Sequence, residues 1–407
     1  MKDNNNNIIV NTLTSFSLDF VDHWPLLADD MSFGYNKLMN SDSQDSLDTV
    51  WSSTSSGQST INDWVTGLDN LGNTCFMNAI LQCLAHTDPL RHYIISNQFL
   101  KDLNKSDGMT AYHLALLFRK LWSNKCQSIR PTQLKALVER SQMFSLRGQQ
   151  DAHEYCIFLL DSLHEDLNRA RSHTFISYTD NNEDEELMNG KMLASHSWSQ
   201  FKKNNDSIIT DLFYGQYASL IRCSICPKDS FKFDPFMCLS LPIPQHYDNI
   251  ELRDCLSLFT ASEYLSNQNS WYCPQCKQTR NAIKRISLWQ LPKILVIQLK
   301  RFCFDENLCS EKITSFVNFP LYGLDLNPYC SNANPNCTYD LYGVVNHYGG
   351  VDGGHYTSYV KCSDNYYDTS IWRCFDDNRV DKVGDESMVT RNAYILFYRR
   401  RDHNSNL

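Results

Sequence analysis

The stretch GLDNLGNTCFMN, residues 67–78, predicts a turn that leads into a helix. Its Asn and Gly residues are typical of turns, and Asn73 or Thr74 could cap a helix that begins near Cys75. A helix N-terminus carries partial positive charge, which favours a thiolate over a thiol. The stretch therefore makes Cys75 a candidate nucleophile, although a small buried hydrophobic residue is the ordinary interpretation of any single cysteine.

The residues that follow have helical periodicity as far as about residue 171. Apolar side chains recur every three or four positions in 76–84, 111–122 and 155–167. This spacing matches an α-helix with 3.6 residues per turn and one buried face. We therefore expect the first part of the chain to form a helical lobe.

Strand and turn patterns take over beyond residue 208. Residues 294–297 are a short apolar run, and β-branched and aromatic side chains are frequent in 341–348, 355–360 and 393–398. The pairs Gly349-Gly350 and Gly353-Gly354 mark turns. Helices followed by strands indicate an α+β fold with at least two lobes.

The composition of the 407 residues disfavours several classes of protein. A hydrophobic content of 42% suffices for a large core, whereas a net charge of -9 gives little electrostatic support for a nucleic-acid partner. No apolar run reaches the roughly 18 residues that span a bilayer, and no secretory segment is evident. We therefore expect the 16 cysteines to work in a reducing compartment, the cytoplasm or nucleus, without disulfides.

Three polar segments are expected to lie outside the core. Residues 1–62 are rich in Asn and Ser and cannot bury enough apolar surface to order themselves, so they predict a disordered tail. Residues 403–407 form a short C-terminal tail. Residues 173–197 include the acidic run 183–186 and indicate a surface loop, with an acidic binding site as the alternative.

Two Cys-x-x-Cys pairs predict a zinc site. Cys223 and Cys226 form the first pair, and Cys273 and Cys276 form the second. Within each pair both sulfurs can bind one ion, and the two pairs complete a tetrahedral structural site. Four unrelated thiols are a weaker alternative because both pairs stand beside prolines typical of tight turns. A redox motif is also weaker because neither pair opens a helix after a strand.

A candidate general base follows the second glycine pair. Gly353 and Gly354 would let backbone and substrate approach closely, and His355 comes directly after them. His347, which lies earlier in the same region, is the competing histidine. Taken singly, each histidine is more often structural or solvated than catalytic, so the choice depends on the neighbouring residues.

Candidate partners for this chemistry come from both ends of the sequence. Asp376 follows an aromatic residue at the end of a predicted strand, where its carboxylate could orient the His355 imidazole, and Asp377 is its rival. Acyl transfer also needs a donor for the developing oxyanion. Asn70 and the backbone N–H of Cys75 are the candidates, although Asn70 also suits an ordinary turn.

Together these segments resemble the ubiquitin-specific proteases. Residues 67–78 are similar to the family's Cys box, and residues 346–357 are similar to its His box. Residues 148–154 resemble the motif between the two boxes, and further matches occur at 233–236, 271–276 and 299–302. The resemblance runs from about residue 65 to residue 402 in the family's order.

The resemblance implies a role for each candidate catalytic residue. Cys75 would be the nucleophile, His355 the general base, Asp376 the orienting acid and Asn70 the oxyanion donor. It assigns His347 to the wall of the cleft rather than to proton transfer. The implied reaction is thiol-dependent hydrolysis of the peptide or isopeptide bond after the C-terminal glycine of ubiquitin, with ubiquitin and its conjugates as partners.

The resemblance also implies where the substrate tail binds. Gln150 and Asp151 would hydrogen-bond the extended tail of ubiquitin, and Tyr356 would line the same channel. The glycines Gly353 and Gly354 would give the tail room.

The implied fold is a papain-like hand spanning residues 63–402. It comprises a helical thumb (63–207), β-rich fingers holding one zinc ion (208–290) and a β-rich palm (291–402). We expect a monomer that binds neither nucleic acid nor membrane. The alternatives are an inactive ubiquitin-binding module, an enzyme for another ubiquitin-like modifier and, less favoured, a zinc-bearing nucleic-acid binder.

Overall fold

The computed structural model describes residues 65–401 apart from short gaps, namely 105–107, 124, 142, 145–147, 171–189, 228, 246–248, 305–309, 333–336, 352 and 365–368. All of these residues fall in one compact unit. The two predicted tails and the acidic run 183–186 lie outside the described residues. Among the described residues, no helix is both long and apolar enough to cross a membrane.

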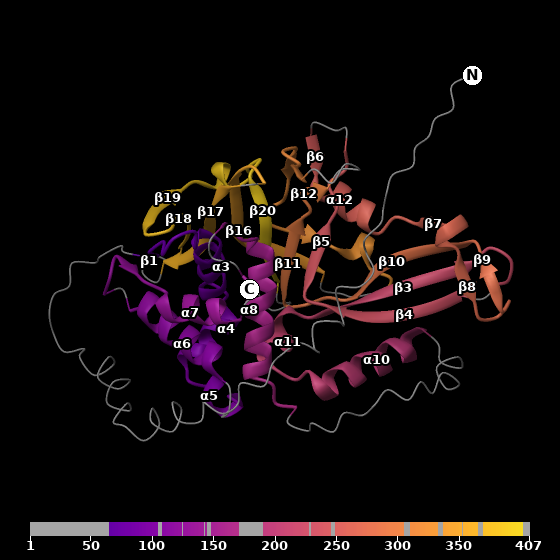
Figure 1. Cartoon of the computed structure of the whole chain (residues 1–407), viewed down its shortest axis with the longest axis horizontal. Helices are drawn as coiled ribbons and strands as arrows, with labels where there is room; N and C mark the ends of the chain where they lie inside the picture. The colour runs from indigo at the N-terminus through magenta and orange to yellow at the C-terminus, as the bar shows by residue number, and fades with distance from the viewer. Residues whose placement is uncertain are drawn as a thin grey trace. The chain divides into compact units, whose positions relative to one another are not determined.

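The thumb is a group of helices around one fully buried helix (Figure 1). Every residue of α3 (Cys75–Ala85) is buried, as expected for a helix that is apolar on most of its surface. It packs against α8 (Ala152–Asp166) on one side and against strands of the palm on the other. The remaining thumb elements are α4 (Asp88–Ile95), α5 (Phe99–Asp102), α6 (Met109–Leu121), α7 (Thr132–Arg140) and the paired strands β1 (Gly67–Leu68) and β2 (Ser128–Ile129).

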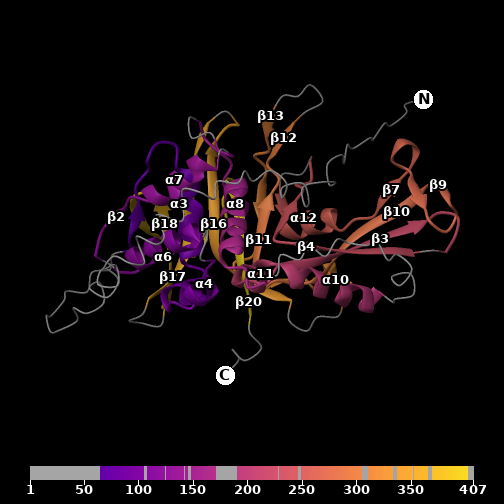
Figure 2. The ribbon, with the colours of Figure 1, turned by 60° about the horizontal axis from the view of Figure 1, so that its bottom comes forward.

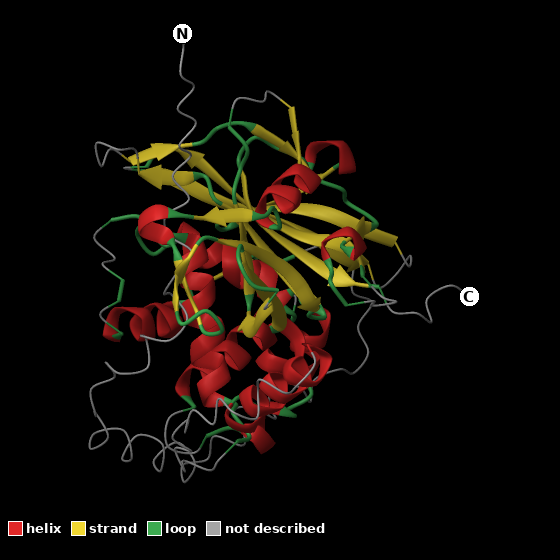
Figure 3. Cartoon of the chain, turned by 90° about the vertical axis from the view of Figure 1, so that its right-hand side faces the viewer, coloured by secondary structure: helices red, strands yellow, loops and turns green. Residues whose placement is uncertain are grey.

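The palm is an eight-stranded, mainly antiparallel sheet. Its strands run in the order β19 (Arg379–Val383), β18 (Thr369–Asp376), β17 (Gly354–Asp364), β16 (Thr338–Gly349), β20 (Ala393–Arg400), β11 (Ile294–Leu299) and β5 (Cys238–Leu241), with β15 (Leu324–Asp325) paired to β16. Only β11 and β5 pair in parallel within it. Figure 3 shows the strands gathered above the red helices of the thumb.

The fingers extend away from the palm as a second sheet (Figure 2). Four strands pair in the order β4 (Asp229–Phe236), β3 (Gly215–Cys223), β10 (Ala282–Gln290) and β7 (Glu263–Leu265). A small hairpin of β8 (Trp271–Cys273) and β9 (Gln278–Arg280) carries the second cysteine pair. The shorter elements nearby are β6 (Asn249–Glu251), β12 (Phe302–Phe304), β13 (Ser310–Lys312), β14 (Phe316–Asn318) and α12 (Leu252–Phe259).

Two helices lie where the sequence predicts a loop or the first strands. Helix α10 (Gly190–Asn204) covers part of the expected loop at 173–197, and its Ala194 packs against Phe233 on β4. Helix α11 (Ile208–Phe213) begins after Ser207, whose hydroxyl accepts a hydrogen bond from the Thr210 N–H. The strands of the second half of the chain therefore begin at Gly215, after α11, rather than at residue 208. The predicted α+β class, helices first and strands after, is confirmed.

Candidate active site

Cys75 is the first residue of α3, at the predicted turn-to-helix junction. The turn contains Gly72 and Asn73 at positive φ (89° and 51°), a conformation that Gly and Asn adopt most readily. Asn70 holds the turn, because its Oδ1 accepts hydrogen bonds from the backbone N–H groups of Gly72 (3.0 Å) and Thr74 (3.2 Å). Thr74 occupies the N-cap position, but its side chain makes no capping bond to the helix.

The Cys75 thiol is buried, with 1% of the residue exposed. Burial raises its pKa, and the charge of Asp377 adds to this effect. A hydrogen bond from the Tyr356 backbone acts in the opposite direction and lowers the pKa. That bond places the thiol beside the residue that follows His355, so the late strand β17 reaches the early helix α3.

His355 and Asp376 form a hydrogen bond of 2.5 Å between Nε2 and Oδ1. The two residues lie on the neighbouring antiparallel strands β17 and β18, whose register brings them diagonally opposite each other. Their side chains are 40% and 44% exposed, so solvent reaches the pair. Because Asp376 binds Nε2, the other ring nitrogen, Nδ1, is the one that can exchange a proton with a thiol.

The competing histidine, His347, lies in a different environment. It is 3% exposed and packs against the rings of Phe302 and Tyr356. Burial lowers its pKa to about 4, and it is therefore neutral at pH 7. A Cβ on Gly354 would come within 2.4 Å of His347 Nε2 and 2.1 Å of the Tyr348 carbonyl oxygen. His347 thus fills the space beside a glycine that cannot carry a side chain.

The hydrogen bonds of the rival acid, Asp377, go to residues of the thumb and not to His355. Its Oδ2 accepts a bond from Asn70 Nδ2 (2.9 Å), and its Oδ1 accepts one from Asn78 Nδ2 (2.8 Å). Its backbone oxygen accepts a further bond from the Leu68 N–H (2.9 Å). Asp377 therefore joins the turn after β18 to the turn before α3. Sequence reasoning missed Asn78, since an Asn inside a helix gives no signal of its own.

The predicted tail-binding residues lie at the start of α8. Asp151 is the N-cap residue, and its Oδ1 accepts bonds from the N–H groups of His153 (2.6 Å) and Glu154 (3.4 Å). Its Oδ2 accepts a bond from the Tyr394 hydroxyl (2.6 Å). Tyr394, like Asn78, was missed because its partner is distant in the sequence. The predicted channel residue Tyr356 is 3% exposed, and its ring packs against that of His347 at an angle of 39°.

The two glutamines before Asp151 differ in what they contact. The Gln150 amide donates to the backbone oxygens of Gln149 (3.1 Å) and Gly148 (3.4 Å). The Gln149 amide lies 4.0 Å from the Cys75 sulfur. Gln149 is therefore a second side-chain donor near the nucleophile. Its place in the motif at 148–154 was the only available signal, and that signal did not distinguish it from Gln150.

The four predicted metal ligands come together at the far end of the fingers. Their sulfurs lie within 4.8 Å of one another, with 4.0 Å between Cys223 and Cys276 and 3.6 Å between Cys226 and Cys273. A tetrahedral Zn–S4 site with bonds of about 2.3 Å requires sulfurs about 3.8 Å apart. The backbone N–H groups of Cys226 and Ile225 lower the pKa of Cys223 to about 6, which favours the thiolate that a metal needs.

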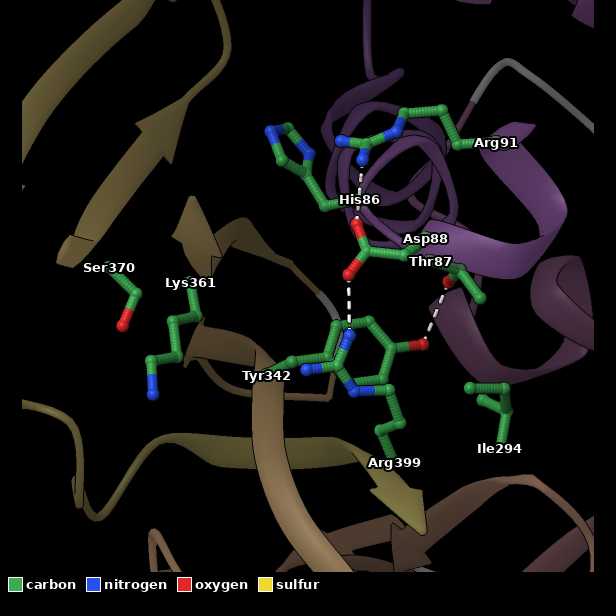
Figure 4. Close-up of a pocket in the computed structure, with 9 residues that line it drawn as sticks. All are labelled: His86, Thr87, Asp88, Arg91, Ile294, Tyr342, Lys361, Ser370 and Arg399. Atoms are coloured by element: carbon green, nitrogen blue, oxygen red, sulfur yellow. Dashed lines mark hydrogen bonds and ion pairs between the residues drawn. The ribbon is translucent and has the colours of Figure 1, made fainter. Parts of the chain in front are cut away.

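A pocket at the opposite end of α3 contains none of these residues (Figure 4). Asp88 forms ion pairs with both Arg91 and Arg399, and the Thr87 hydroxyl lies 2.7 Å from that of Tyr342. The charges that line the pocket are thus largely paired with one another. We assign the pocket no part in the chemistry of Cys75.

The fold and the site define a class of protein. A helical lobe packed on a β-sheet, with a cysteine at a helix N-terminus and a histidine–aspartate pair on adjacent strands, is the arrangement of papain-like cysteine hydrolases. The family model described as ubiquitin carboxyl-terminal hydrolase matches residues 66–398, and the chain belongs to this family. The predicted resemblance is therefore confirmed.

Curated relatives carry the same description. The chain is 38% identical over 358 residues to ubiquitin carboxyl-terminal hydrolase 2 of Bos taurus, a match that covers 85% of this chain and 57% of the relative. It is 34% identical over 398 residues to ubiquitin carboxyl-terminal hydrolase 4 of Saccharomyces cerevisiae (strain ATCC 204508 / S288c), covering 89% of this chain and 42% of the relative. The chain thus spans about half the length of these relatives.

Solved structures share the fold. A structure of the yeast SAGA DUBm matches with a TM-score of 0.65 at 28% identity, covering 90% of this chain and 75% of that chain. A SAGA DUB module bound to monoubiquitin matches with a TM-score of 0.66 at 28% identity, covering 90% and 76%. These matches confirm the predicted hand of thumb, palm and fingers.

Proposed function

We propose that this chain is a thiol-dependent deubiquitinase that hydrolyses the bond after the C-terminal glycine of ubiquitin. The observation that carries the proposal is the hydrogen bond between the Cys75 thiol, at the start of α3, and the backbone of Tyr356, the residue that follows the Asp376-bound His355. Membership of the ubiquitin carboxyl-terminal hydrolase family supports the choice of ubiquitin as substrate. A similar module solved with monoubiquitin supports it further.

In the proposed reaction, each group has a defined role. His355 Nδ1 accepts the thiol proton, and the Cys75 thiolate attacks the glycine carbonyl. His355 then donates that proton to the departing amine, which leaves a thioester on Cys75. Water attacks the thioester with His355 again acting as base, and this releases the ubiquitin carboxylate and restores the thiol. Asp376 holds the imidazole orientation and stabilises its charged form throughout.

Three donors can stabilise the oxyanion of the tetrahedral intermediate. One N–H of the Asn70 amide is bound by Asp377, so the other can donate to the oxyanion. The Cys75 backbone N–H lies at the open first turn of α3, where helix N–H groups lack helical partners. The Gln149 amide, 4.0 Å from the sulfur, is the third.

Zinc would be structural in this scheme. The four cysteine sulfurs match the spacing of a closed tetrahedral site, and such a site leaves no position for a reacting water. When bound, one zinc ion would tie the end of β3 to the β8–β9 hairpin. The cysteines therefore stabilise the fingers rather than take part in hydrolysis.

We further propose that the chain acts as a monomer in the cytoplasm, the nucleus or both. The absence of a disulfide requirement fits a reducing compartment, because the described cysteines are free thiols. The similar SAGA structures contain other subunits, so the oligomeric state needs direct measurement by sedimentation or light scattering.

Hydrolysis of a fluorogenic amide at the C-terminus of ubiquitin tests the function. The zinc-loaded chain should turn over this substrate, and Cys75→Ala should not, although it should still bind ubiquitin. Binding of ubiquitin without turnover by the unmodified chain would instead identify an inactive binding module. Probes built on other ubiquitin-like proteins test the choice of modifier, and faster reaction with one of them would replace ubiquitin as the substrate.

A further inference from the structure

We propose that Tyr394 is a positioning residue that fixes the Asp151 carboxylate on the wall of the substrate channel. The inference rests on the proposed function, in which Asp151 binds the extended tail of ubiquitin. Tyr394 lies on the palm strand β20 and Asp151 is the N-cap residue of the thumb helix α8, so their 2.6 Å hydrogen bond joins palm and thumb.

The Asp151 carboxylate has little freedom while this bond is present. Two backbone N–H groups of α8 hold Oδ1, and the Tyr394 hydroxyl holds Oδ2. A carboxylate oxygen has two lone pairs, so Oδ2 keeps one for an outside donor such as a backbone N–H of the tail. Without the hydroxyl, Oδ2 would lose its only hydrogen bond from the described residues.

A chain of hydrogen bonds sets the direction of the Tyr394 proton. The Gln298 amide donates to the Tyr394 hydroxyl (2.8 Å), and the Gln298 oxygen accepts from the Ser240 hydroxyl (2.6 Å). Since ionised Asp151 can only accept, the Tyr394 proton must point to it. If the Gln298 amide were flipped, its oxygen and Asp151 Oδ2 would both need the single Tyr394 proton. One of these two oxygens would then face the hydroxyl oxygen with no proton between them.

The surroundings of Tyr394 prevent water from replacing its contacts. The residue is fully buried, and its ring packs edge-on against Phe302 and near Tyr356. A buried hydrogen bond to a charged group is stronger than one between neutral groups. Loss of the hydroxyl should therefore leave Asp151 Oδ2 without this donor, because water cannot take the place of the hydroxyl.

Tyr398 provides a matched control on the same strand. It is four residues further along β20, is also fully buried, and donates a hydrogen bond of 2.8 Å to the Pro320 carbonyl oxygen. Tyr398→Phe removes the same atom from the same kind of site. The two variants therefore differ mainly in the acceptor that loses its donor. This acceptor is the Pro320 carbonyl oxygen for Tyr398→Phe and the Asp151 carboxylate for Tyr394→Phe.

The test compares Tyr394→Phe with Tyr398→Phe in steady-state hydrolysis of the ubiquitin C-terminal amide. Tyr394→Phe should raise KM about tenfold, the usual cost of losing a hydrogen bond to a charged partner, while kcat changes much less. Tyr398→Phe should leave KM within about twofold, because surface or core contacts remote from the channel do not alter binding. Thermal melting should show that both variants fold.

A double variant separates positioning from simple loss of packing. Asp151→Asn keeps an oxygen for the helix cap but removes the charge that Tyr394 holds. If Tyr394 acts through Asp151, adding Tyr394→Phe to Asp151→Asn should change KM by less than about twofold. Fully additive effects, or equal KM values for the two tyrosine variants, would overturn the proposal while leaving the proposed function intact.

Binding measurements distinguish failure of the two proposals. In a Cys75→Ala background, ubiquitin should bind about tenfold more weakly when Tyr394→Phe is added. An unmodified chain that neither binds nor hydrolyses ubiquitin would overturn the proposed function and the inference with it. Normal hydrolysis with an unchanged binding constant for Tyr394→Phe would overturn the inference alone.

Discussion

Asp376 and Asp377 are adjacent in the sequence but have different partners. Asp376 contacts His355, whereas Asp377 contacts Asn70 and Asn78 across the lobe boundary. Asp377 reaches these partners from a turn in which its φ is 52°, and its carboxylate still lies within 4.8 Å of that of Asp376. At the scale of single residues, the two adjacent acids thus have separate partners, and under the proposed function one would serve the base and the other the oxyanion donor.

Removal of each acid should have a distinct kinetic signature. Asp376→Ala should lower kcat by about 10²-fold or more and shift the acidic limb of the kcat/KM profile, because it releases the general base. Asp377→Ala should also lower kcat by about 10²-fold through Asn70, but should shift that limb less. The check is a pH profile of ubiquitin amide hydrolysis for both variants. Identical profiles would contradict the division of tasks.

His86, the buried C-cap residue of α3, makes stability depend on pH. Burial lowers the pKa of His86 in the folded chain to about 4, below its ordinary value of 6.5. The unfolded chain therefore takes up a proton that the folded chain does not, and this stability contribution is present above pH 6.5 and lost as pH falls towards 4. His86→Gln should reduce the loss of stability between pH 7 and pH 5 by about 2 kcal/mol.

Denaturant unfolding at the two pH values measures this effect. His92→Gln is the control, because His92 is exposed on the neighbouring helix α4. It should leave the pH dependence as it is in the unmodified chain. If His86→Gln and the unmodified chain lost the same unfolding free energy between pH 7 and pH 5, His86 would not be the source of the pH dependence.

At the scale of elements, the hairpin of β16 and β17 places the candidate base. Its strands pair from Gly343 with Val360 to Gly349 with Gly354, and His355 is the second residue of β17. The two glycines before His355 are not equivalent. A Cβ at Gly354 would meet backbone and imidazole atoms, whereas a Cβ at Gly353 would meet nothing within 4 Å.

Alanine at these two glycines should therefore have unequal effects on stability. Gly354→Ala should lower the free energy of unfolding by about 1–3 kcal/mol, the usual cost of overpacking a tight site. Gly353→Ala should change it by no more than about 0.5 kcal/mol. Urea unfolding of the two variants measures the difference. Equal stabilities would show that β16 can move away from Gly354 at little cost.

Long elements with a clear period could be predicted from the sequence, whereas short ones could not. Helices α3, α6 and α8 and strands β11, β16, β17 and β20 all lie where periodicity or composition indicated them. Helix α10 buries only Ala194, so it shows no apolar face by which to recognise it. Within the site, Cys75 and His355 stand in long motifs that indicate their roles. Asn78 and Gln149 lie in the motifs 67–78 and 148–154, but nothing in those motifs indicates what they contact, and Tyr394 lies in no motif. Their contacts depend on how strands and helices from distant parts of the chain meet.

At the scale of the whole described unit, the fingers depend on the cysteine cluster more than the thumb does. The β8–β9 hairpin has three paired positions and two exposed large apolar residues nearby, Tyr272 and Ile225, so little core holds it. The thumb, by contrast, shares one large core with the palm. Stabilisation by a metal should therefore be local to the fingers.

Removal of metal should destabilise the fingers while leaving the thumb and palm folded. A chelator, or Cys226→Ser, should remove one zinc per chain and speed hydrogen exchange in 271–280, while α3 stays protected. Hydrolysis should weaken through KM, since the reacting groups remain in place. Metal analysis and hydrogen exchange on one sample check this. Cys330→Ser, outside the cluster, is the control, and loss of protection in α3 would contradict the prediction.

The position of β20 in the sheet has a consequence for the newly made chain. It comes last among the described strands, yet it lies between β16 and β11, so neither of those can complete its pairing until residues 393–400 have left the ribosome. Until then two apolar strand edges stay open, a state that invites association with other chains. The Tyr394–Asp151 contact between palm and thumb must also wait, because Tyr394 lies on β20. The order of synthesis thus delays completion of the palm sheet until nearly all of this unit has been made.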